Sequence, residues 1–392
     1  MTPKGFSFAA IRARFKPWDK EDFGLIASDR PCAAAAVFTT NRAKAAPVLL
    51  DMKHIKSKTH RAIIVNSGCA NAATGATGYQ NALKTARLAA KALGCRTEEV
   101  LVASTGVIGV HLNPKVKIED GVPLLAKKLG KSPAGFVRAI MTTDTKPKSA
   151  SKSVMLGGKK VTIWGSAKGA GMIHPDMATM LSFVVTDANV PKPVLQSALK
   201  QAADKTFNRL TIDGDTSTND TLAVLANGAA ENAPLKTGTP DFAKFTQALS
   251  AVCDSLSGQI VADGEGVSRI ARISVEKAAS QKEALAVARA IAGSLLVKTA
   301  LHGGDPNWGR IICAAGYSGE KVNPDKMELY FGRHCAFRNG QPASTPEKLL
   351  SAEMNKKKVA MRLVLNRGAA GDSYLFCDIS HEYVTINSHY RT

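Results

Sequence analysis

A glycine-rich run near the middle of the chain leads into a threonine that opens an apolar segment. The run begins at Gly169, the threonine is Thr179, and we expect the apolar segment 180–185 to form a buried strand. Cleavage of the peptide bond between Ala178 and Thr179 would give the threonine a free α-amine. Such an amine titrates near neutrality and can act as general base for the threonine hydroxyl, which makes Thr179 a candidate nucleophile. An ordinary strand-opening threonine after a turn is the alternative interpretation.

Groups that could assist such a nucleophile occur elsewhere in the chain. A short apolar run, 100–103, ends in Ser-Thr-Gly at 104–106, where a hydroxyl and a backbone N–H could form an oxyanion hole. Lys168 would favour a bound carboxylate and would lower the pKa of a neighbouring Thr179 amine. Glu265, which stands between two glycines, would suit a substrate ammonium group. A plain loop, a surface lysine and a solvated turn carboxylate are the corresponding alternatives.

Metal chemistry finds little support in the sequence. The segment 213–220 is dense in carboxylates and hydroxyls, but it lacks the glycine and the terminal glutamate of a calcium loop, so we expect a structural loop. The seven cysteines are odd in number and far apart, without the spacing of a zinc site. We therefore expect reduced thiols and no metal.

The elements that would position these residues mix strands and helices without regular alternation. This arrangement favours an α+β layered fold over a doubly wound one. Apolar, β-branched runs predict strands at 25–28, 33–40, 46–50, 61–65, 100–103, 180–185, 221–226, 270–275, 328–331, 359–365 and 373–378. A helical period predicts helices at 81–93, 122–129, 133–141, 191–207, 241–256 and 281–301. A Gly-Gly turn predicts a hairpin over 153–164, whose second strand leads to Lys168.

Composition narrows the classes of partner. The 392 residues are 45% hydrophobic and 21% charged, as in an ordinary globular protein. The formal net charge is +20, but Lys and Arg are scattered and aromatic residues make up only 6%, so we expect a basic surface for small anionic substrates and no nucleic acid. No apolar run is long enough to span a membrane and no secretory signal is visible, so we expect a cytoplasmic protein without a membrane partner.

The segment from Lys168 to Leu181 resembles the autocleavage and active-site motif of the ornithine acetyltransferases, also called glutamate N-acetyltransferases. The similarity runs through nearly the whole chain and includes the segments 213–220 and 305–310. It implies an α/β layered sandwich of the N-terminal-nucleophile-like kind, cut into an α chain, 1–178, and a β chain, 179–392. These chains would assemble as a heterotetramer of two α and two β chains. The chain departs from the family pattern at His174-Pro175-Asp176 and at Ala170.

The resemblance also implies an activity and a set of residues. The enzyme would transfer the acetyl group of N2-acetylornithine to L-glutamate through an acetyl-Thr179 intermediate, in the cyclic route of arginine biosynthesis. No cofactor is implied, and acetyl-CoA is a further acetyl donor that the sequence neither requires nor excludes. The implied oxyanion hole is Thr105 with Gly106, and the implied substrate contacts are Thr145, Lys168, Thr179, Glu265, Asn387 and Thr392. We further expect Lys168 to meet the α-carboxylate, and Glu265 the side-chain ammonium of ornithine, on electrostatic grounds.

Two other classes of function remain open from the sequence. An N-terminal-nucleophile aminopeptidase or amidase of related fold would pass the acyl group to water, although such aminopeptidases usually have serine where this chain has Thr179. A non-catalytic basic binding protein would stay uncut and would bind polyanions in a salt-sensitive manner. Ornithine release in the absence of glutamate distinguishes hydrolysis from transfer.

Overall fold

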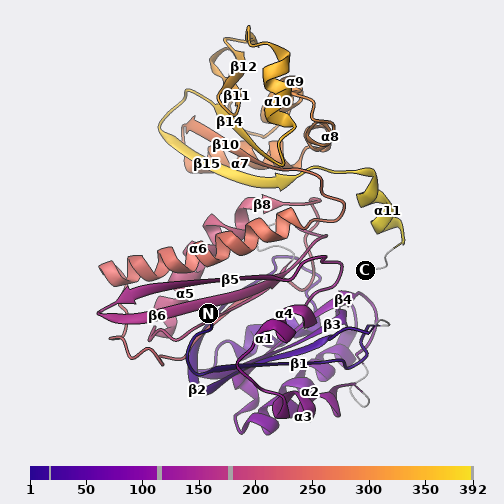
Figure 1. The fold of residues 1–392 in the computed structure, drawn as a ribbon, viewed down its shortest axis with the longest axis vertical. Coiled ribbons are helices and arrows are strands. Elements are labelled where there is room, and N and C mark those ends of the chain that lie inside the picture. Colours follow the sequence, from indigo (N-terminus) through magenta and orange to yellow (C-terminus); the bar gives the residue numbers. More distant parts are fainter. Residues whose placement is uncertain (17–18, 113–116, 175–179, 390–392) are drawn as a thin grey trace.

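Two mixed β-sheets covered by helices form the framework of the molecule (Figure 1). The structure is a computed structural model that describes residues 1–16, 19–112, 117–174 and 180–389. The α+β layered fold expected from the sequence is confirmed.

The larger sheet has eight strands in the order β4-β3-β2-β9-β7-β6-β5, with β1 paired to β2. The 16-residue strand β2 pairs with β3 through its first half and with β9 through its second half, so it joins two portions of the sheet. Strands β3 and β4 are parallel, as are β7 and β9. The bounds are β1 Phe6–Ile11, β2 Phe23–Phe38, β3 His60–Cys69, β4 Val100–Val107, β5 Lys148–Leu156, β6 Lys159–Lys168, β7 Leu181–Thr186 and β9 Thr221–Ala226.

The smaller sheet lies at the top of Figure 1 and has seven strands in the order β13-β12-β11-β14-β10-β15-β8. Strand β8 lies between β7 and β9 in the sequence and pairs in parallel with β15, so it ties the smaller sheet to the rest of the molecule. The bounds are β8 Leu210–Thr211, β10 Ile270–Ala278, β11 Glu328–Phe331, β12 His334–Arg338, β13 Gln341–Pro342, β14 Lys358–Val364 and β15 Ala370–Cys377.

Helices bury the apolar faces of both sheets. Helices α5 and α6 pack on β2, β5 and β6, while α2 packs on β4, and α7 covers β10 and β15. The apolar residues between each helix and its sheet form the hydrophobic cores. The bounds are α1 Ala46–His54, α2 Gly75–Leu93, α3 Gly121–Lys127, α4 Ala134–Ala139, α5 Lys192–Lys205, α6 Pro240–Ala262, α7 Gln281–Gly293, α8 Leu295–Gly303, α9 Trp308–Gly316, α10 Glu347–Met354 and α11 His381–His389.

Several segments differ from the sequence prediction; for example, helix α2 starts at Gly75, six residues before its predicted start. The strand predicted at 46–50 is wrong, because Ala46–His54 forms helix α1 with a proline in its first turn. The helix predicted at 281–301 is broken at Ser294, whose hydroxyl accepts a hydrogen bond from Val297 N and so caps a new helix, α8. Helix α6 extends to Ala262, six residues beyond its predicted end.

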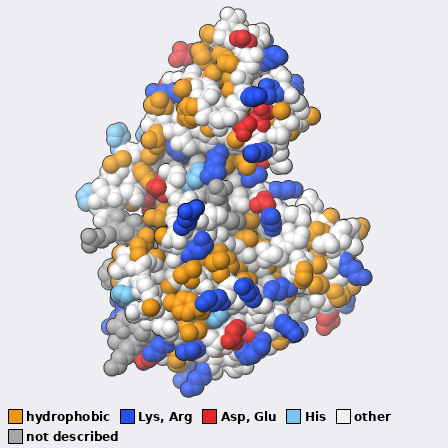
Figure 2. Space-filling view, turned by 180° about the vertical axis from the view of Figure 1, so that it is seen from behind, with side chains coloured by type: hydrophobic (Ala, Val, Ile, Leu, Met, Phe, Trp, Pro, Cys, Tyr) orange, Lys and Arg blue, Asp and Glu red, His pale blue; other side chains and the backbone are white. Residues whose placement is uncertain are grey.

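Surface and hydropathy give two further facts. Figure 2 shows Lys and Arg side chains spread over both halves of the visible face, rather than gathered in one stripe. Among the helices of the described residues, none taken singly has the length and apolar character to cross a membrane; α7 and α8 meet that test only together, and they are bent by 61°.

Candidate active site

The ends of the parallel strands β3 and β4 bring two small-residue turns side by side. Ser67 pairs with Thr105, and Gly68 pairs with Gly106. Gly106 has φ +131°, and a Cβ atom placed there would lie 2.3 Å from the carbonyl carbon of Gly68. Only glycine tolerates so close an approach of the two backbones. This approach fixes the orientation of the peptide group between Thr105 and Gly106.

Lys168 ends strand β6 and reaches the Thr105 side chain. Its Nζ donates a hydrogen bond of 3.2 Å to Thr105 Oγ1. Because an ammonium group only donates, the Thr105 oxygen acts as acceptor there, and its own hydrogen can be donated to a third group. Burial lowers the pKa of Lys168, while the charges of Asp144 and Glu265 oppose that shift.

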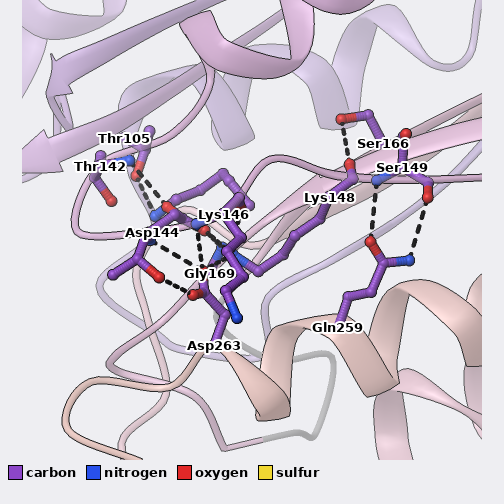
Figure 3. A network of polar contacts seen from close by, with 12 residues as sticks. Thr105, Thr142, Asp144, Lys146, Lys148, Ser149, Ser166, Gly169, Gln259 and Asp263 are labelled. Carbon is purple, nitrogen blue, oxygen red and sulfur yellow. Dashed lines mark hydrogen bonds and ion pairs between the residues drawn. The ribbon is translucent and has the colours of Figure 1, made fainter.

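Asp144 holds the backbone around Lys168. Its Oδ1 accepts a 2.7 Å hydrogen bond from Gly169 N, and its Oδ2 accepts one of 2.9 Å from Thr142 N (Figure 3). Burial opposes ionisation of this carboxyl, but the positive charges of Lys168 and Lys148 outweigh it and lower its pKa to about 2. Asp144 is therefore a buried carboxylate at neutral pH.

Glu265 lies against the glycine-rich segment that follows Lys168 and lines the same cavity. Its backbone N–H donates to Ala170 O at 2.9 Å, and its Oε2 accepts a 2.8 Å hydrogen bond from Asn387 Nδ2. A Cβ atom at Gly171 would lie 2.3 Å from Glu265 Oε2, so the glycine makes room for the carboxylate. The sequence suggested an exposed turn, but the Glu265 residue is only 8% exposed.

Helix α11 closes one side of the site with the C-terminal segment. Ser380 Oγ donates a 2.7 Å hydrogen bond to Gly266 O, and the left-handed Gly266 (φ +68°) leaves space for the backbone of Tyr383. The helix thereby presents Tyr383 and Asn387 to the cavity. A loose C-terminal tail is excluded for the segment up to residue 389.

The loop 213–219 is a wall of the site that the sequence analysis described only as structural. Asp213 accepts hydrogen bonds from the N–H groups of Met172 and Ile173, at 2.5 and 2.7 Å. Asn219 Nδ2 donates to Ala70 O and Ser104 O, which fastens the loop to the ends of β3 and β4. Burial raises the pKa of Asp213. The density of carboxylates and hydroxyls in this loop was the signal of a polar cavity wall.

These walls enclose a cavity of about 320 Å³. Among the described residues, its charged lining consists of one ammonium, on Lys168, and the carboxyl groups of Asp213, Asp215 and Glu265. Such a cavity suits a small molecule that carries both a carboxylate and an ammonium group. The described residues that line it are Ala70, Thr105, Gly106, Ile108, Thr142, Lys168, Gly171, Met172, Asp213, Asp215, Ser217, Thr218, Asn219, Glu265, Tyr383 and Asn387.

The structure gathers most of the residues that the sequence singled out. Thr105, Gly106, Lys168, Glu265 and Asn387 all line this cavity. Three further positions from the sequence analysis, Ala178, Thr179 and Thr392, lie outside the described residues.

Thr145 is the exception among the expected substrate contacts. Its side chain is exposed, it is absent from the cavity wall, and its hydroxyl donates to Asp263 Oδ1. Thr142, three residues earlier, lines the cavity instead. Both threonines lie in the same polar turn, and nothing in the sequence shows that Thr142 lines the cavity; a substrate contact by Thr145 stays a prediction.

Metal-binding potential is low in the described part of the chain. Within residues 1–16, 19–112, 117–174 and 180–389, no three His, Cys, Asp or Glu side chains gather in a way that could hold a metal ion.

Comparison with known proteins gives a consistent family. The model of the ArgJ family matches residues 7–392. The "Arginine biosynthesis bifunctional protein ArgJ" of Thermotoga neapolitana is 47% identical over all of this chain and 99% of its own length. The protein of the same name from Dehalococcoides mccartyi is also 47% identical, over all of this chain and 96% of its own. A crystal structure of the Bacillus halodurans protein is 44% identical with a TM-score of 0.53, and covers 54% of this chain and 100% of the solved chain.

Proposed function

Because the chain belongs to the ArgJ family, we propose that it transfers the acetyl group of N2-acetylornithine to L-glutamate in arginine biosynthesis. Its products are ornithine and N-acetylglutamate. The observation that carries this proposal is the hydrogen bond from Lys168 Nζ to Thr105 Oγ1, in a cavity that also holds Gly106 and Glu265.

The proposed nucleophile is Thr179, freed by cleavage after Ala178. Leu181, two residues after it, pairs with the cavity residue Lys168 across β6 and β7, which supports a position of Thr179 near the cavity. The length of the solved relative supports the cut: that chain is matched in full by about half of this one. Residues 179–392 likewise make up a little over half of the sequence.

The chemistry proceeds in two half-reactions. The Thr179 amine takes the proton of the Thr179 hydroxyl as the oxygen attacks the acetyl carbonyl. The Thr105 hydroxyl and the Gly106 N–H donate to the oxyanion, and the hydrogen bond from Lys168 keeps the Thr105 hydrogen directed away from Lys168. The proton then passes to the departing α-amine, ornithine leaves, and the acetyl ester remains on Thr179. The α-amine of glutamate attacks this ester in the reverse sequence of steps.

Recognition follows from the charges of the cavity. Donor and acceptor share an α-carboxylate, which we assign to Lys168. The side-chain ammonium of ornithine is assigned to Glu265, which Asn387 orients, and the neighbouring acidic loop 213–219 adds to the attraction. We add Thr142 as a turn contact because it lines the cavity, while a contact by Thr145 stays a prediction. Thr392, three residues beyond α11, remains a proposed contact.

Assembly and donor range complete the proposal. We infer a heterotetramer of two α chains, 1–178, and two β chains, 179–392, that works in the cytoplasm without a cofactor. Relatives that carry the word bifunctional in their names motivate acetyl-CoA as a second donor. Native mass spectrometry tests the assembly, and replacement of N2-acetylornithine by acetyl-CoA in the transfer assay tests the donor.

The deciding experiment compares wild type with Thr179→Ala. Intact mass under denaturing conditions should give two fragments for the wild type, split between Ala178 and Thr179, and one full-length chain for the variant. Acetyl transfer from N2-acetylornithine to glutamate should be present only in the wild type. Sustained ornithine release without glutamate would instead indicate a hydrolase, and an uncut, inactive wild type would refute the nucleophile.

A further inference from the structure

A buried ion cluster of three side chains lies behind the cavity. Lys148 Nζ is 2.6 Å from Asp144 Oδ1 and 2.5 Å from Asp263 Oδ2 (Figure 3). The three side chains are 1%, 0% and 4% exposed, in the order Lys148, Asp144, Asp263. None of the three belongs to the cavity lining.

Each carboxylate of this cluster holds backbone that leads into the cavity. Asp144 accepts from the N–H groups of Thr142 and Gly169, so it fixes one cavity residue and the neighbour of another, Lys168. On the other side, Asp263 stands two residues before Glu265 in the segment that follows α6. Lys148 therefore provides a second link, besides the hydrogen bond from Glu265 N to Ala170 O, between the segment that carries Lys168 and the segment that carries Glu265.

Asp263 also fixes the turn between the two segments. Its Oδ2 accepts from the N–H groups of Thr145 and Lys146, at 3.0 and 3.2 Å, and its Oδ1 accepts the Thr145 hydroxyl. With Lys148 Nζ these contacts give the carboxylate four donors. Every donor is provided by the turn 145–148, so the position of this turn depends on Asp263.

Stability alone does not explain such a cluster. Removing two carboxylates and an ammonium from water is costly, and well-packed apolar residues of similar volume often stabilise a core as well or better. Ion pairs that include several short, directed hydrogen bonds provide a defined geometry. Here that geometry is the separation between the two segments.

We propose that Lys148, with Asp144 and Asp263, is a positioning residue that sets the separation of Lys168 from Glu265 and thereby the length of amino acid that the cavity accepts. The inference rests on the proposed function, in which Lys168 meets the α-carboxylate and Glu265 the side-chain ammonium. The cluster then sets the distance between the groups that bind those two charges, which in ornithine are separated by the α-carbon and three methylene groups.

The experiment measures selectivity between donors that differ by one methylene. Steady-state kcat/KM is determined for N2-acetylornithine and N2-acetyllysine with glutamate as acceptor, in the wild type, Lys148→Met and Asp263→Asn. One methylene in a fitted pocket is worth about 10- to 200-fold. We expect the wild-type preference for N2-acetylornithine to fall about tenfold or more in both variants, mainly because KM for N2-acetylornithine rises.

A matched control separates position from stability. Asp372→Asn removes a half-buried ion pair, 3.0 Å between Asp372 Oδ1 and Arg209 Nε, next to the smaller sheet. This variant should retain the wild-type preference even where its melting temperature falls as much as that of Asp263→Asn. Asp263→Asn preserves volume and an oxygen acceptor, so it decides the question if Lys148→Met does not fold.

The outcomes distinguish this inference from the proposed function. Equal losses on both donors, with the preference unchanged, would overturn the inference and reduce the cluster to a structural role. A wild type that transfers from both donors equally well would also overturn it, yet would leave acetyl transfer established. A wild type without transfer from N2-acetylornithine would refute the proposed function itself.

Discussion

Two clusters in this molecule combine a hydroxyl, a carboxylate and a basic side chain, and their hydrogen bonds run in different directions. Beside the smaller sheet, Ser268, His302 and Asp378 have the residue types of a hydrolytic triad. Asp378 Oδ2 accepts the Ser268 hydroxyl and lies 2.9 Å from His302 Nδ1, and the same ring nitrogen lies 3.5 Å from Ser268 Oγ. A proton relay needs the hydroxyl on one ring nitrogen and the carboxylate on the other.

The cavity cluster, formed by Thr105, Lys168 and Glu265, has the opposite arrangement. Lys168 donates to Thr105, so the Thr105 hydrogen can point toward a reacting carbonyl. Asp378, in contrast, accepts the Ser268 hydrogen, so this hydroxyl cannot donate to another group. The first arrangement makes a donor available, and the second fastens the start of β10 to the ends of α8 and β15. The direction of the hydrogen bonds, rather than the residue types, separates a reactive cluster from a structural one.

The largest expected effect concerns the Thr105 hydroxyl, the proposed hydrogen-bond donor to the oxyanion. Thr105→Val keeps the shape of the side chain and removes its O–H, so the transition state loses one oxyanion donor. We expect kcat for acetyl transfer to fall by about 10²–10³, the usual cost of such a donor, with a smaller change in KM. Steady-state kinetics on fully cleaved enzyme measures it. A fall of less than threefold would remove Thr105 from the oxyanion hole.

The charge on Lys168 should appear in the pH profile. In the proposed mechanism Lys168 binds the substrate carboxylate as an ammonium, and burial lowers its pKa from 10.5. Activity should therefore decline on the alkaline side below that pH, as Lys168 loses its proton. Arginine stays charged to above pH 12, so Lys168→Arg should shift the alkaline decline of kcat/KM upward. An unchanged alkaline limb would assign it to another group.

A smaller effect is expected at the C-terminal helix. Asn387→Ala removes the donor that orients Glu265, and it should raise KM for N2-acetylornithine about three- to tenfold, the worth of one ordinary hydrogen bond. The neighbouring exposed Ser388 provides the matched control, because Ser388→Ala leaves the Glu265 contact in place. Equal KM values in the two variants would contradict the orienting role.

The smallest effect on activity is expected at the other cluster. Ser268→Ala should leave kcat and KM for acetyl transfer within about twofold, since this serine lies outside the cavity lining. It should lower the free energy of unfolding by about 1–3 kcal/mol, because the buried Asp378 carboxylate loses a donor. Denaturant titration and the acetyl-transfer assay measure the two quantities. A large loss of activity at wild-type stability would give Ser268 a chemical role.

Local sequence patterns predicted much of the fold. They failed where tertiary contacts determine the structure of a segment. Runs such as 61–65 and 100–103 form strands, and Gly94 ends α2 in the left-handed conformation, as its sequence position indicates. The five apolar residues 46–50 were too few to distinguish a strand from a helix. Which threonine near Asp144, Thr142 or Thr145, faces the cavity could not be predicted from the sequence. Pairing of β3 with β4, and the docking of α11, are long-range contacts that no local pattern contains.

The strand order of the larger sheet has a consequence for the cut protein. Residues before the proposed cleavage point supply β4, β3 and β2 on one side and β6 and β5 on the other, and residues after it supply β9 and β7 between them. The two polypeptides would therefore be interleaved through the middle of one sheet. Neither could leave without separating β2 from β9 and β6 from β7, so the two polypeptides would be expected to come apart only when this sheet unfolds. Chains synthesised separately would have to thread two strands into an unfinished sheet, which makes cleavage after folding the natural order of events.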